Sequence, residues 1–340
     1  MAAEFKSAIS LKPMNTFGMD VHAARFAVFT DEYQLQQQLE ALHSLTDPIL
    51  ILGGGSNILF TRDFPGVVLK DEIGGVSIVD DSEDEVLVRV GAGVVWHTLV
   101  DWCIQHDLGG LENLSLIPGT CGAAPIQNIG AYGVELKDVF HALECYQISD
   151  GSKLEFAADQ CAFGYRDSVF KRSMKGKAVI TSVTLKLSRK HRLNVTYGAI
   201  TQELQKMGIS NPNIRNVSDA VCNIRRSKLP DPATIGNAGS FFKNPEVSAT
   251  THDALKREFP NMVSYPFGAS TFKLAAGWLI EQCGWKGKVV GRTGSHKDQA
   301  LVLVNYGGAT GDDVVRLSEE IRASVRGKFG VEIEPEVNII

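Results

Sequence analysis

The chain has 340 residues, 44% of them apolar and 21% charged, which is the composition of an ordinary globular protein with room for two or three domains. The net charge of −5 argues against nucleic acid or an anionic membrane surface as a partner, since either would need a basic face. Phosphate groups must therefore be held by backbone amides and a few arginine or lysine side chains.

Six cysteines are spread along the chain, and no two of them form a Cys-x-x-Cys pair. This spacing predicts buried free thiols in a reducing compartment and no metal site. Residues 1–14 lack the apolar core of a signal peptide, and no apolar run approaches the roughly 18 residues of a membrane span. We therefore expect a cytoplasmic protein that does not insert into a membrane.

Apolar spacing predicts the first regular elements. Leucines at helical spacing indicate a helix over residues 31–45, and the apolar run at 49–52 indicates a strand that leads into a glycine-rich loop. Alternating valines predict a strand over 86–90, which a glycine-bearing turn connects to a helix over 96–106. The chain thus opens with a helix–strand–loop unit.

The middle of the chain is rich in predicted strands. Asp150-Gly151 is a strong hairpin signal between strands at 143–148 and 153–156, and a later strand covers 183–187. A polar stretch around residues 189–216, which contains Asn211-Pro212-Asn213, follows these strands. It is the best candidate for a domain boundary.

The last third of the chain alternates helices and strands. A helix around residues 220–224 is stopped by two prolines, and apolar spacing predicts another helix over 274–284. A strand over 300–305 precedes a helix over 312–328, whose acidic start and basic end suit the helix dipole. Glutamates that alternate with apolar residues predict a final strand over 331–337.

Two glycine-rich segments carry the strongest functional signal. Ile117–Gly133 is almost uncharged and is too broken by glycine and proline to form a regular core element. Gly53–Asn57 follows the apolar run at 49–52 and has the same character. Glycine lets backbone amides approach a ligand closely. Two such segments therefore predict a long anionic ligand, such as a dinucleotide.

Neither segment matches a standard nucleotide-binding fingerprint. Ile58 stands where Gly-x-Gly-x-x-Gly requires its third glycine, and the chain has no Gly-x-x-x-x-Gly-Lys loop. A single strand followed by glycines is more often a tight turn than a phosphate site. The presence of the second segment favours a ligand over two unrelated turns.

Several polar residues have both a structural and a functional interpretation. Arg166 either pairs with Asp167 at the surface or binds a substrate carboxylate with its planar fork, and the sequence alone favours the surface pair. Ser240 lies in a glycine-bordered turn, where a turn residue and a shielded proton donor are equally expected. Glu336 lies in a row of alternating glutamates, which favours a solvated strand face. His296 is interpreted as a loop histidine, because no second metal-ligating side chain stands at a suitable spacing.

Taken together, eight segments resemble one family, the flavoprotein UDP-N-acetylenolpyruvoylglucosamine reductases (MurB) of peptidoglycan synthesis. They occur in the family's order from about residue 15 to the C-terminus, so the resemblance covers nearly the whole chain. A stretch around Tyr197 matches the longer subclass, type I. The eight segments are 15–18, Gly53–Asn57, Ile117–Gly133 with Glu135, 163–168, 228–232, 236–245, 296–305 and 334–337.

The resemblance implies an α+β fold in three parts. An FAD-binding domain of the vanillyl-alcohol-oxidase/PCMH type is expected over residues 1–210, in two subdomains that divide near residue 70. A C-terminal α/β substrate-binding domain is expected over 211–328. A terminal strand at 329–340 is expected to return Glu336 to the active site.

The resemblance also implies the cofactors. FAD is expected to bind non-covalently to both glycine-rich segments, with Arg225 as an added cation, and NADPH is expected as the co-substrate that donates the hydride. The residues implied in FAD binding are Gly53, Gly54, Gly55, Ser56, Asn57, Ile117, Pro118, Gly119, Ala123, Ala124, Ile126, Asn128, Gly130, Ala131, Tyr132 and Arg225.

The reaction implied by the family is reduction of UDP-N-acetylglucosamine enolpyruvate to UDP-N-acetylmuramate, carried out by a monomer. The hydride comes from flavin N5, Ser240 protonates the neighbouring carbon, and Arg166 and Glu336 flank the carboxylate, with Glu336 protonated or sharing a proton. A serine acid requires a dry site and donors that stabilise the departing alkoxide. Contacts with the substrate are implied for Tyr165, Tyr197, Lys228, Asn244 and Gln299.

Two other functions share some of these features. An oxidase on the same flavin fold would use oxygen in place of NADPH and often carries a flavin-linking His or Cys, for which Cys121 is the candidate. A non-catalytic UDP-sugar-binding protein would lack the constellation of Arg, Ser and Glu. All three of those positions are filled in this chain.

Overall fold

A computed structural model of the protein describes residues 4–43 and 46–340. The chain divides into two compact units. The first comprises Met1–Ile9, Ala23–Gly55 and Phe64–Ser227, and the second comprises Ser10–His22, Ser56–Asp63 and Lys228–Ile340. The expected domains meet at residue 211, whereas the units divide at Lys228, because the preceding helix packs its apolar face within the first unit.

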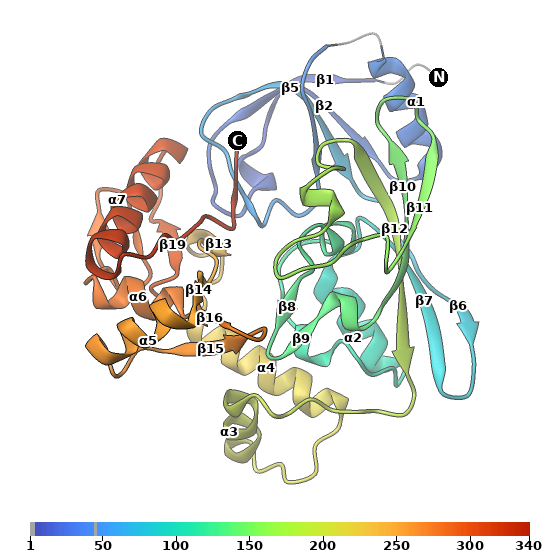
Figure 1. Cartoon of the computed structure of the whole chain (residues 1–340). Coiled ribbons are helices and arrows are strands. Elements are labelled where there is room, and N and C mark those ends of the chain that lie inside the picture. The colour runs from blue at the N-terminus through green and yellow to red at the C-terminus, as the bar shows by residue number, and fades with distance from the viewer. Residues whose placement is uncertain (1–3, 44–45) are drawn as a thin grey trace. The chain divides into compact units, whose positions relative to one another are not determined.

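The first sheet of the first unit is built around parallel pairs (Figure 1). Helix α1 (Glu32–Leu42) begins at Asp31, whose side chain accepts a hydrogen bond from Gln34 N–H, and its buried leucines pack on the sheet. This confirms the first predicted helix, of which residues 44–45 lie outside the described residues. The strand order is β1 (Lys6–Ser10), β2 (His22–Phe29), β5 (Phe64–Asp71) and β3 (Ile49–Leu52).

The second sheet of the first unit is antiparallel, and the chain enters it after Asp71. The predicted hairpin is confirmed: its strands pair and Gly151 turns the chain with a φ of +67°. Helix α2 (Trp96–Gln105) buries its apolar side against the valines of β7. The strand order is β11 (Lys153–Ala157), β10 (Phe140–Gln147), β12 (Ala178–Ser188), β7 (Glu85–Gly91) and β6 (Val76–Asp81).

Two helices follow the second sheet. The sequence does not predict α3 (Gly198–Lys206), which lies inside the polar stretch interpreted as a boundary. Helix α4 (Ile214–Lys228) ends ahead of the prolines, as predicted. Apolar side chains of α3 and α4 share one cluster, which explains why this stretch folds with the first unit.

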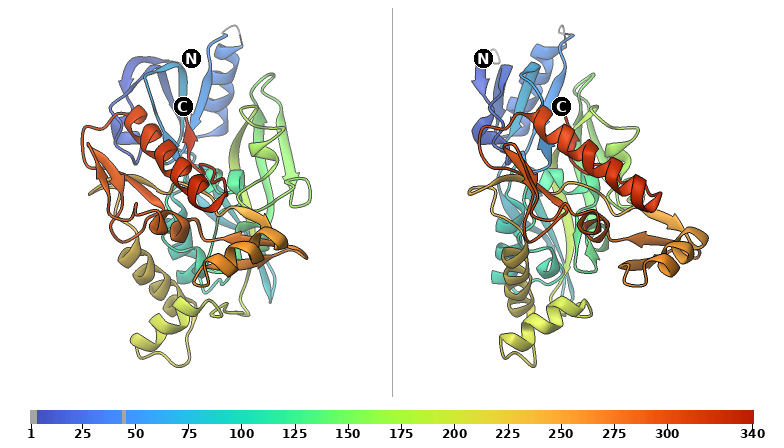
Figure 2. Two further views of the ribbon diagram at one scale, coloured as in Figure 1. Left: turned by 60° about the vertical axis from the view of Figure 1, so that its left-hand side comes forward. Right: turned by 90° about the vertical axis from the view of Figure 1, so that its left-hand side faces the viewer.

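The second unit contains two small sheets. Helix α7 (Gly311–Phe329), the long red helix in Figure 2, packs against β18 and β19 and confirms the prediction over 312–328. Helix α6 (Ala276–Gln282) begins later than predicted, because Leu274 ends a strand. The strand order of one sheet is β13 (Gly236–Ser240), β19 (Val302–Asn305), β18 (Thr293–Ser295) and β17 (Val289–Val290). The strand order of the other is β14 (Glu246–Ser248), β16 (Thr271–Leu274) and β15 (Ser264–Phe267), and helix α5 (Ala249–Glu258) lies beside it.

The C-terminal segment returns to the body of the second unit. The predicted strand over 331–337 is wrong in extent, because only Pro335 forms a bridge, with Phe242. The regular strand comes later, where β20 (Asn338–Ile339) pairs in parallel with β4 (Ile58–Leu59). The predicted alternation nevertheless holds, since the apolar residues of this segment are buried.

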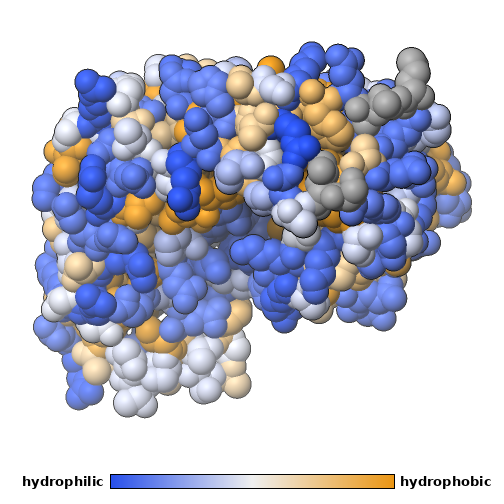
Figure 3. Space-filling view, turned by 90° about the horizontal axis from the view of Figure 1, so that it is seen from above, coloured by the Kyte–Doolittle hydropathy of each residue, from blue (hydrophilic) through white to orange (hydrophobic). Residues whose placement is uncertain are grey.

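Among the described residues, no helix is both long and apolar enough to cross a lipid bilayer. Hydrophilic side chains cover most of the face seen in Figure 3.

The remaining elements are short. They are β8 (Gly130–Ala131), β9 (Val134–Glu135) and the 3-10 turns η1 (Lys12–Met14), η2 (Glu112–Leu114), η3 (Cys121–Ala123), η4 (Pro125–Gln127), η5 (Leu136–Asp138) and η6 (Val169–Lys171).

Candidate active site

Gly53–Gly55 of the first glycine-rich segment lie against the second glycine-rich segment in the first unit. A Cβ on Gly54 would stand 3.0 Å from Gly119 Cα, and a Cβ on Gly53 would stand 2.5 Å from Thr120 Oγ1. Non-bonded carbon atoms are normally about 3.5–4.0 Å apart, so a side chain at either position would push the segments apart. The two segments therefore form a single cradle.

The second segment of the cradle rests on the start of α2. Trp96 N–H donates to Gly119 O at 3.0 Å, and Gly119 has a φ of +115°, which favours glycine. A Cβ on Gly122 would lie 2.5 Å from Ala92 Cβ. These two positions require glycine for the backbone to take this path.

Asn128 is predicted to bind the cofactor, but its side chain holds the cradle together. The residue is fully buried and has a left-handed backbone, with a φ of +43°. Its Nδ2 donates to Glu135 Oε2 (3.0 Å) and Gly164 O (2.9 Å), and its Oδ1 accepts from Lys137 N–H (3.0 Å). The side-chain amide is therefore engaged by the protein and shapes the loop.

Arg225 joins α4 to the cradle through neutral groups. Its Nε donates to Leu116 O (3.1 Å), and its guanidinium hydrogen-bonds the Tyr132 hydroxyl. Neither partner neutralises the guanidinium, and Arg166 adds a second positive charge nearby. Burial lowers the pKa of Arg225 and raises the pKa of Tyr132. This part of the first unit therefore favours an anion.

Arg166, the predicted carboxylate ligand, is fixed to the second glycine-rich segment. Its backbone is left-handed, with a φ of +53°, and its Nη2 donates to Gly130 O at 2.9 Å. Its guanidinium carbon lies 5.7 Å from the centre of the Tyr165 ring. Asp167, the partner in the surface interpretation, forms an ion pair with Arg172 at 3.3 Å. Arg166 is therefore held against the second glycine-rich segment.

Ser240 ends β13 in the second unit, beside a break in strand pairing. The pairing register shifts between Asn237 and Ser240, where Gly239 adopts a φ of +69°. Left-handed glycines of this kind form bulges that re-aim the next side chain. The carbonyl of the following residue, Phe241, accepts a hydrogen bond from Glu336 N–H at 2.7 Å. Glu336 therefore lies on the segment that binds the residue after Ser240.

The predicted substrate residues are divided between the units. In the first unit, Tyr197 is 43% exposed at the start of α3, and its ring meets Tyr132 edge to face at 5.4 Å. In the second unit, Asn244 Oδ1 accepts from Ala276 N–H at 3.0 Å and so caps α6. Gln299 is half-buried in the same unit.

Two residues predicted to bind the cofactor, Ser56 and Asn57, lie in the second unit. Asn57 holds the C-terminal segment: its Nδ2 donates to Glu336 O (3.3 Å), and its carbonyl accepts from Asn338 N–H (3.0 Å). Lys228 also belongs to this unit and is exposed. The structure therefore groups Asn57 with Glu336.

The predicted free thiols are confirmed, and five of the six cysteines are buried. Burial raises the pKa of the Cys121 thiol well above its ordinary value. A thiol that stays protonated and enclosed is poorly suited to form a covalent link with a flavin. Within residues 4–43 and 46–340, no group of three His, Cys, Asp or Glu side chains is arranged to hold a metal ion.

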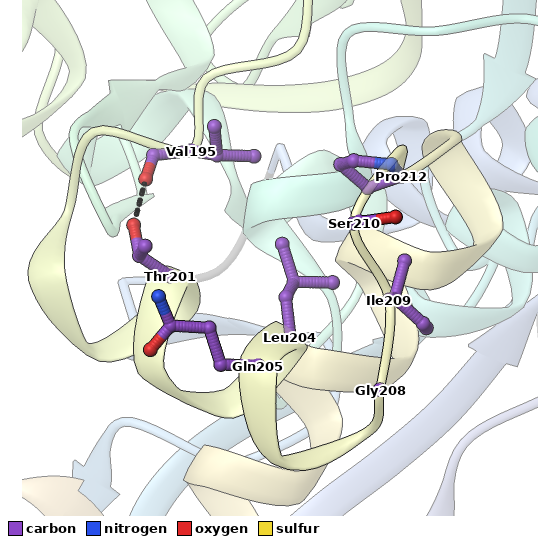
Figure 4. A pocket seen from close by; sticks show the side chains of 8 residues that line it. All are labelled: Val195, Thr201, Leu204, Gln205, Gly208, Ile209, Ser210 and Pro212. Carbon is purple, nitrogen blue, oxygen red and sulfur yellow. Dashed lines mark hydrogen bonds between the residues drawn. The ribbon is translucent and has the colours of Figure 1, made fainter.

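Two cavities contain none of the predicted site residues. One of about 440 Å³ opens beside α3, where Thr201 Oγ1 donates to Val195 O at 2.7 Å (Figure 4). Its eight described lining residues carry no charge, so it offers nothing to neutralise a phosphate. The other, of about 640 Å³, lies in the second unit, and its lining mixes lysine and arginine with two aspartates.

Two residues that support the cradle are not among the predicted site residues. His97 on α2 accepts Leu116 N–H at Nδ1 (3.1 Å), and buried Asn113 donates to Tyr132 O (3.1 Å) and Asn194 O (2.8 Å). A polar residue among leucines is a usable signal for Asn113. Nothing in the local sequence marks His97.

Known families match both units. A family described as "UDP-N-acetylenolpyruvoylglucosamine reductase, C-terminal domain" matches residues 231–340, and one described as "FAD binding domain" matches residues 23–157. The chain is 51% identical over 339 residues to the UDP-N-acetylenolpyruvoylglucosamine reductase of Pseudomonas aeruginosa, with 100% of both chains covered. It is 51% identical over 344 residues to the enzyme of that name from Burkholderia multivorans, with 97% of each covered.

A solved structure supports the fold. The crystal structure of UDP-N-acetylenolpyruvylglucosamine reductase from Thermus caldophilus has a TM-score of 0.69 to this chain, at 24% identity. The match covers 99% of this chain and 98% of that one. Together with the two matched domains, it confirms the expected α+β fold with an FAD-binding part and a C-terminal part.

Proposed function

Because this chain belongs to the family of UDP-N-acetylenolpyruvoylglucosamine reductases, flavin-dependent oxidoreductases, we propose that it reduces UDP-N-acetylglucosamine enolpyruvate to UDP-N-acetylmuramate with NADPH. The observation that carries this proposal is the 51% identity over the entire chain. The proposed reaction belongs to peptidoglycan synthesis in the bacterial cytoplasm. The enzyme is proposed to act as a monomer.

The first unit has the features that FAD requires. Gly53 and Gly54 lie so close to the second segment that a Cβ at either would collide with it, and Arg166 and Arg225 supply positive charge in the same unit. Backbone amides in such a cradle bind a pyrophosphate, and the arginines complement its charge. We assign this role to residues 53–55 and 117–132. When bound, the flavin supplies the hydride from N5.

Ser240 is proposed to protonate the carbon next to the reduced methylene. Its place at the Gly239 bulge supports this role, because a bulge re-aims a side chain out of the strand. The two phenylalanines that follow, Phe241 and Phe242, are 0% and 1% exposed. They make this end of β13 apolar, and a serine acid requires such dry surroundings.

Glu336 is proposed to stabilise the enol-like intermediate with a shared proton. Its backbone is fixed on both sides, since its N–H donates to Phe241 O (2.7 Å) and its carbonyl accepts from Asn57 Nδ2 (3.3 Å). Arg166 is proposed to bind the carboxylate of the substrate, for which its planar guanidinium is better shaped than an ammonium group. That role rests on the family resemblance and on the contacts of Arg166 within the first unit.

The remaining site residues are proposed to contact the UDP-sugar. Tyr197 is the most exposed aromatic candidate, and its edge-to-face contact with Tyr132 connects it to the cradle. Asn244 uses Oδ1 to cap α6, so its NH2 group is assigned to the substrate. The full set comprises Tyr165, Tyr197, Lys228, Asn244 and Gln299.

Anaerobic absorbance spectroscopy of the purified protein tests the proposed function. NADPH should bleach the flavin spectrum, and UDP-N-acetylglucosamine enolpyruvate should restore it. A colourless protein that gains no spectrum with added FAD would refute the flavoenzyme assignment. A yellow protein that only oxygen reoxidises would instead be an oxidase, and one that binds the UDP-sugar without reacting would be a binding protein.

A further inference from the structure

Leu116 precedes the second glycine-rich segment in a conformation that its own side chain disfavours. Its φ is +58°, in the left-handed region, where residues with a Cβ are strained. Contacts with the rest of the protein must impose this conformation. Any other φ would redirect the chain at Ile117, the first residue of the segment.

Two helices hold Leu116, one at each of its backbone polar groups. Its N–H donates to Nδ1 of His97 on α2 at 3.1 Å. Its carbonyl accepts from Nε of Arg225 on α4 at 3.1 Å. With both groups bound to helices, the peptide planes on either side of Leu116 cannot rotate freely.

The chain is anchored again immediately before and after this point. Trp96 Nε1 donates to Leu114 O at 2.9 Å, and Trp96 N–H donates to Gly119 O at 3.0 Å. Only residues 117–118 lie between Leu116 and Gly119. The direction of the chain at Leu116 therefore determines the path of this part of the cradle.

The hydrogen bond from Leu116 fixes the tautomer of His97. A backbone N–H only donates, so Nδ1 must present a lone pair and the neutral ring carries its proton on Nε2. Nε2 lies 3.7 Å from Asp101 Oδ2 and 3.9 Å from Cys222 Sγ. This group is not a nucleophilic triad, because Nε2 already bears a hydrogen and burial raises the pKa of the Cys222 thiol. A proton added at Nδ1 would face the Leu116 N–H, donor against donor.

The groups around His97 favour its neutral form. Asp101 faces the ring from the same helix, and Arg215, Arg225 and Arg226 face it from α4. Burial lowers the pKa of His97 most, the arginines lower it further, and Asp101 opposes them. The ring is therefore neutral at pH 7 and gains a proton only below its ordinary value of 6.5.

We propose that His97 is a positioning residue for FAD: it keeps Leu116 left-handed by accepting its N–H, and protonation of the ring releases the loop and weakens FAD binding. The inference rests on the proposed assignment of residues 117–119 to the FAD site. It gives FAD affinity a pH dependence that originates in a residue outside the cradle.

Two variants of His97 and one control distinguish the effect of losing the hydrogen-bond acceptor from the effect of losing the volume of the ring. His97→Asn keeps an acceptor, because Oδ1 takes about the place of Nδ1, but it does not titrate. His97→Leu fills the space without an acceptor. His106→Asn is the matched control at the end of α2, where the histidine Nδ1 lies 2.8 Å from Trp102 O of its own helix.

FAD is titrated into each apoprotein, and flavin fluorescence gives the dissociation constant from about pH 5 to about pH 8. In the wild type and in His106→Asn, this constant should rise as the pH falls below about 6.5. In His97→Asn it should stay level, and in His97→Leu it should be about 10-fold higher at neutral pH. Identical pH profiles for the wild type and His97→Asn would overturn the proposal.

Hydrogen exchange of the apoprotein gives a second readout. The Leu116 amide should exchange faster in His97→Leu than in His97→Asn, with no flavin present. Equal exchange rates would show that the hydrogen bond does not hold Leu116, which overturns the proposal. Faster exchange with unchanged FAD affinity would overturn the link to the cofactor. Neither readout requires turnover, so a failure of the proposed reaction would leave both unchanged.

Discussion

Gly53→Ala should force the two glycine-rich segments apart, and loss of the Thr120 hydroxyl should allow them to meet again. The new Cβ would stand 2.5 Å from Thr120 Oγ1, about 1 Å inside an ordinary contact. The next atoms, Thr120 Cβ and Cγ2, are 3.7 Å and 3.8 Å away. The clash therefore depends on a single oxygen atom.

Thr120 has little freedom to escape this clash. It is 6% exposed, and its backbone pairs with Val95. Overpacking of a well-packed site costs about 1–3 kcal/mol. The apoprotein relieves this strain when the segments move apart and FAD binding must restore it, so we expect the FAD dissociation constant of Gly53→Ala to rise by about 5- to 150-fold. Gly53→Ala/Thr120→Ala should recover most of the affinity, and Thr120→Ala alone should stay within about 3-fold of the wild type.

Fluorescence titration of the apoproteins with FAD, together with thermal unfolding, measures these effects. Gly53→Ala/Thr120→Ser keeps the oxygen atom and should not recover. Gly74→Ala is the matched control, because a Cβ there meets no heavy atom within 4 Å. If Gly53→Ala binds FAD like the wild type, the two segments do not form one cradle. The same conclusion follows if the double variant Gly53→Ala/Thr120→Ala binds FAD as weakly as Gly53→Ala.

Three further changes test other parts of the structure. Burial raises the pKa of Asp71 to about 7 from an ordinary value of 3.8, so the folded state keeps a proton that the unfolded state loses. The stability that the protonated carboxyl contributes is therefore lost as pH rises through 7. Asp71→Asn should therefore raise the melting temperature more at pH 8 than at pH 5, and equal shifts in calorimetry would contradict this. Arg225→Lys should weaken FAD binding about 10-fold in calorimetric titration, because an ammonium group cannot reproduce the fork that joins Leu116 O to the Tyr132 hydroxyl; unchanged affinity would refute that role. Thr310→Ala should lower the free energy of unfolding in urea by about 1 kcal/mol, because Thr310 and Asp313 cap α7 reciprocally; no change would show that the cap is dispensable.

Features that depend on local chemistry are predictable from the sequence. The β10–β11 hairpin follows from Asp150-Gly151, since glycine turns the chain at low cost, and α7 follows from its apolar face and charged ends. The two segments that form the cradle can be recognised from their glycines, because two glycine-rich, uncharged segments are hard to explain unless they bind a ligand. In each case the residues that form the feature are also the ones that signal it.

Features that depend on distant partners are not predictable in this way. Leu116 carries no signal for a left-handed backbone, because His97 and Arg225, far from it in the sequence, impose that conformation. The predicted start of α6 at residue 274 is too early for a similar reason, since Leu274 pairs in a strand and Asn244 caps the helix at Ala276. Local spacing contains neither contact.

Anaerobic stopped-flow spectroscopy of Ser240→Ala separates reduction of the enzyme by NADPH from its reaction with the enolpyruvyl substrate. A positioned proton donor contributes a factor of roughly 10²–10⁴ to a rate. If Ser240 is the acid, NADPH should bleach the flavin of Ser240→Ala at nearly the wild-type rate. The return of absorbance with substrate should then be slower by roughly 100-fold or more. If both steps slow equally, or if the second step keeps its wild-type rate, Ser240 is not the proton donor.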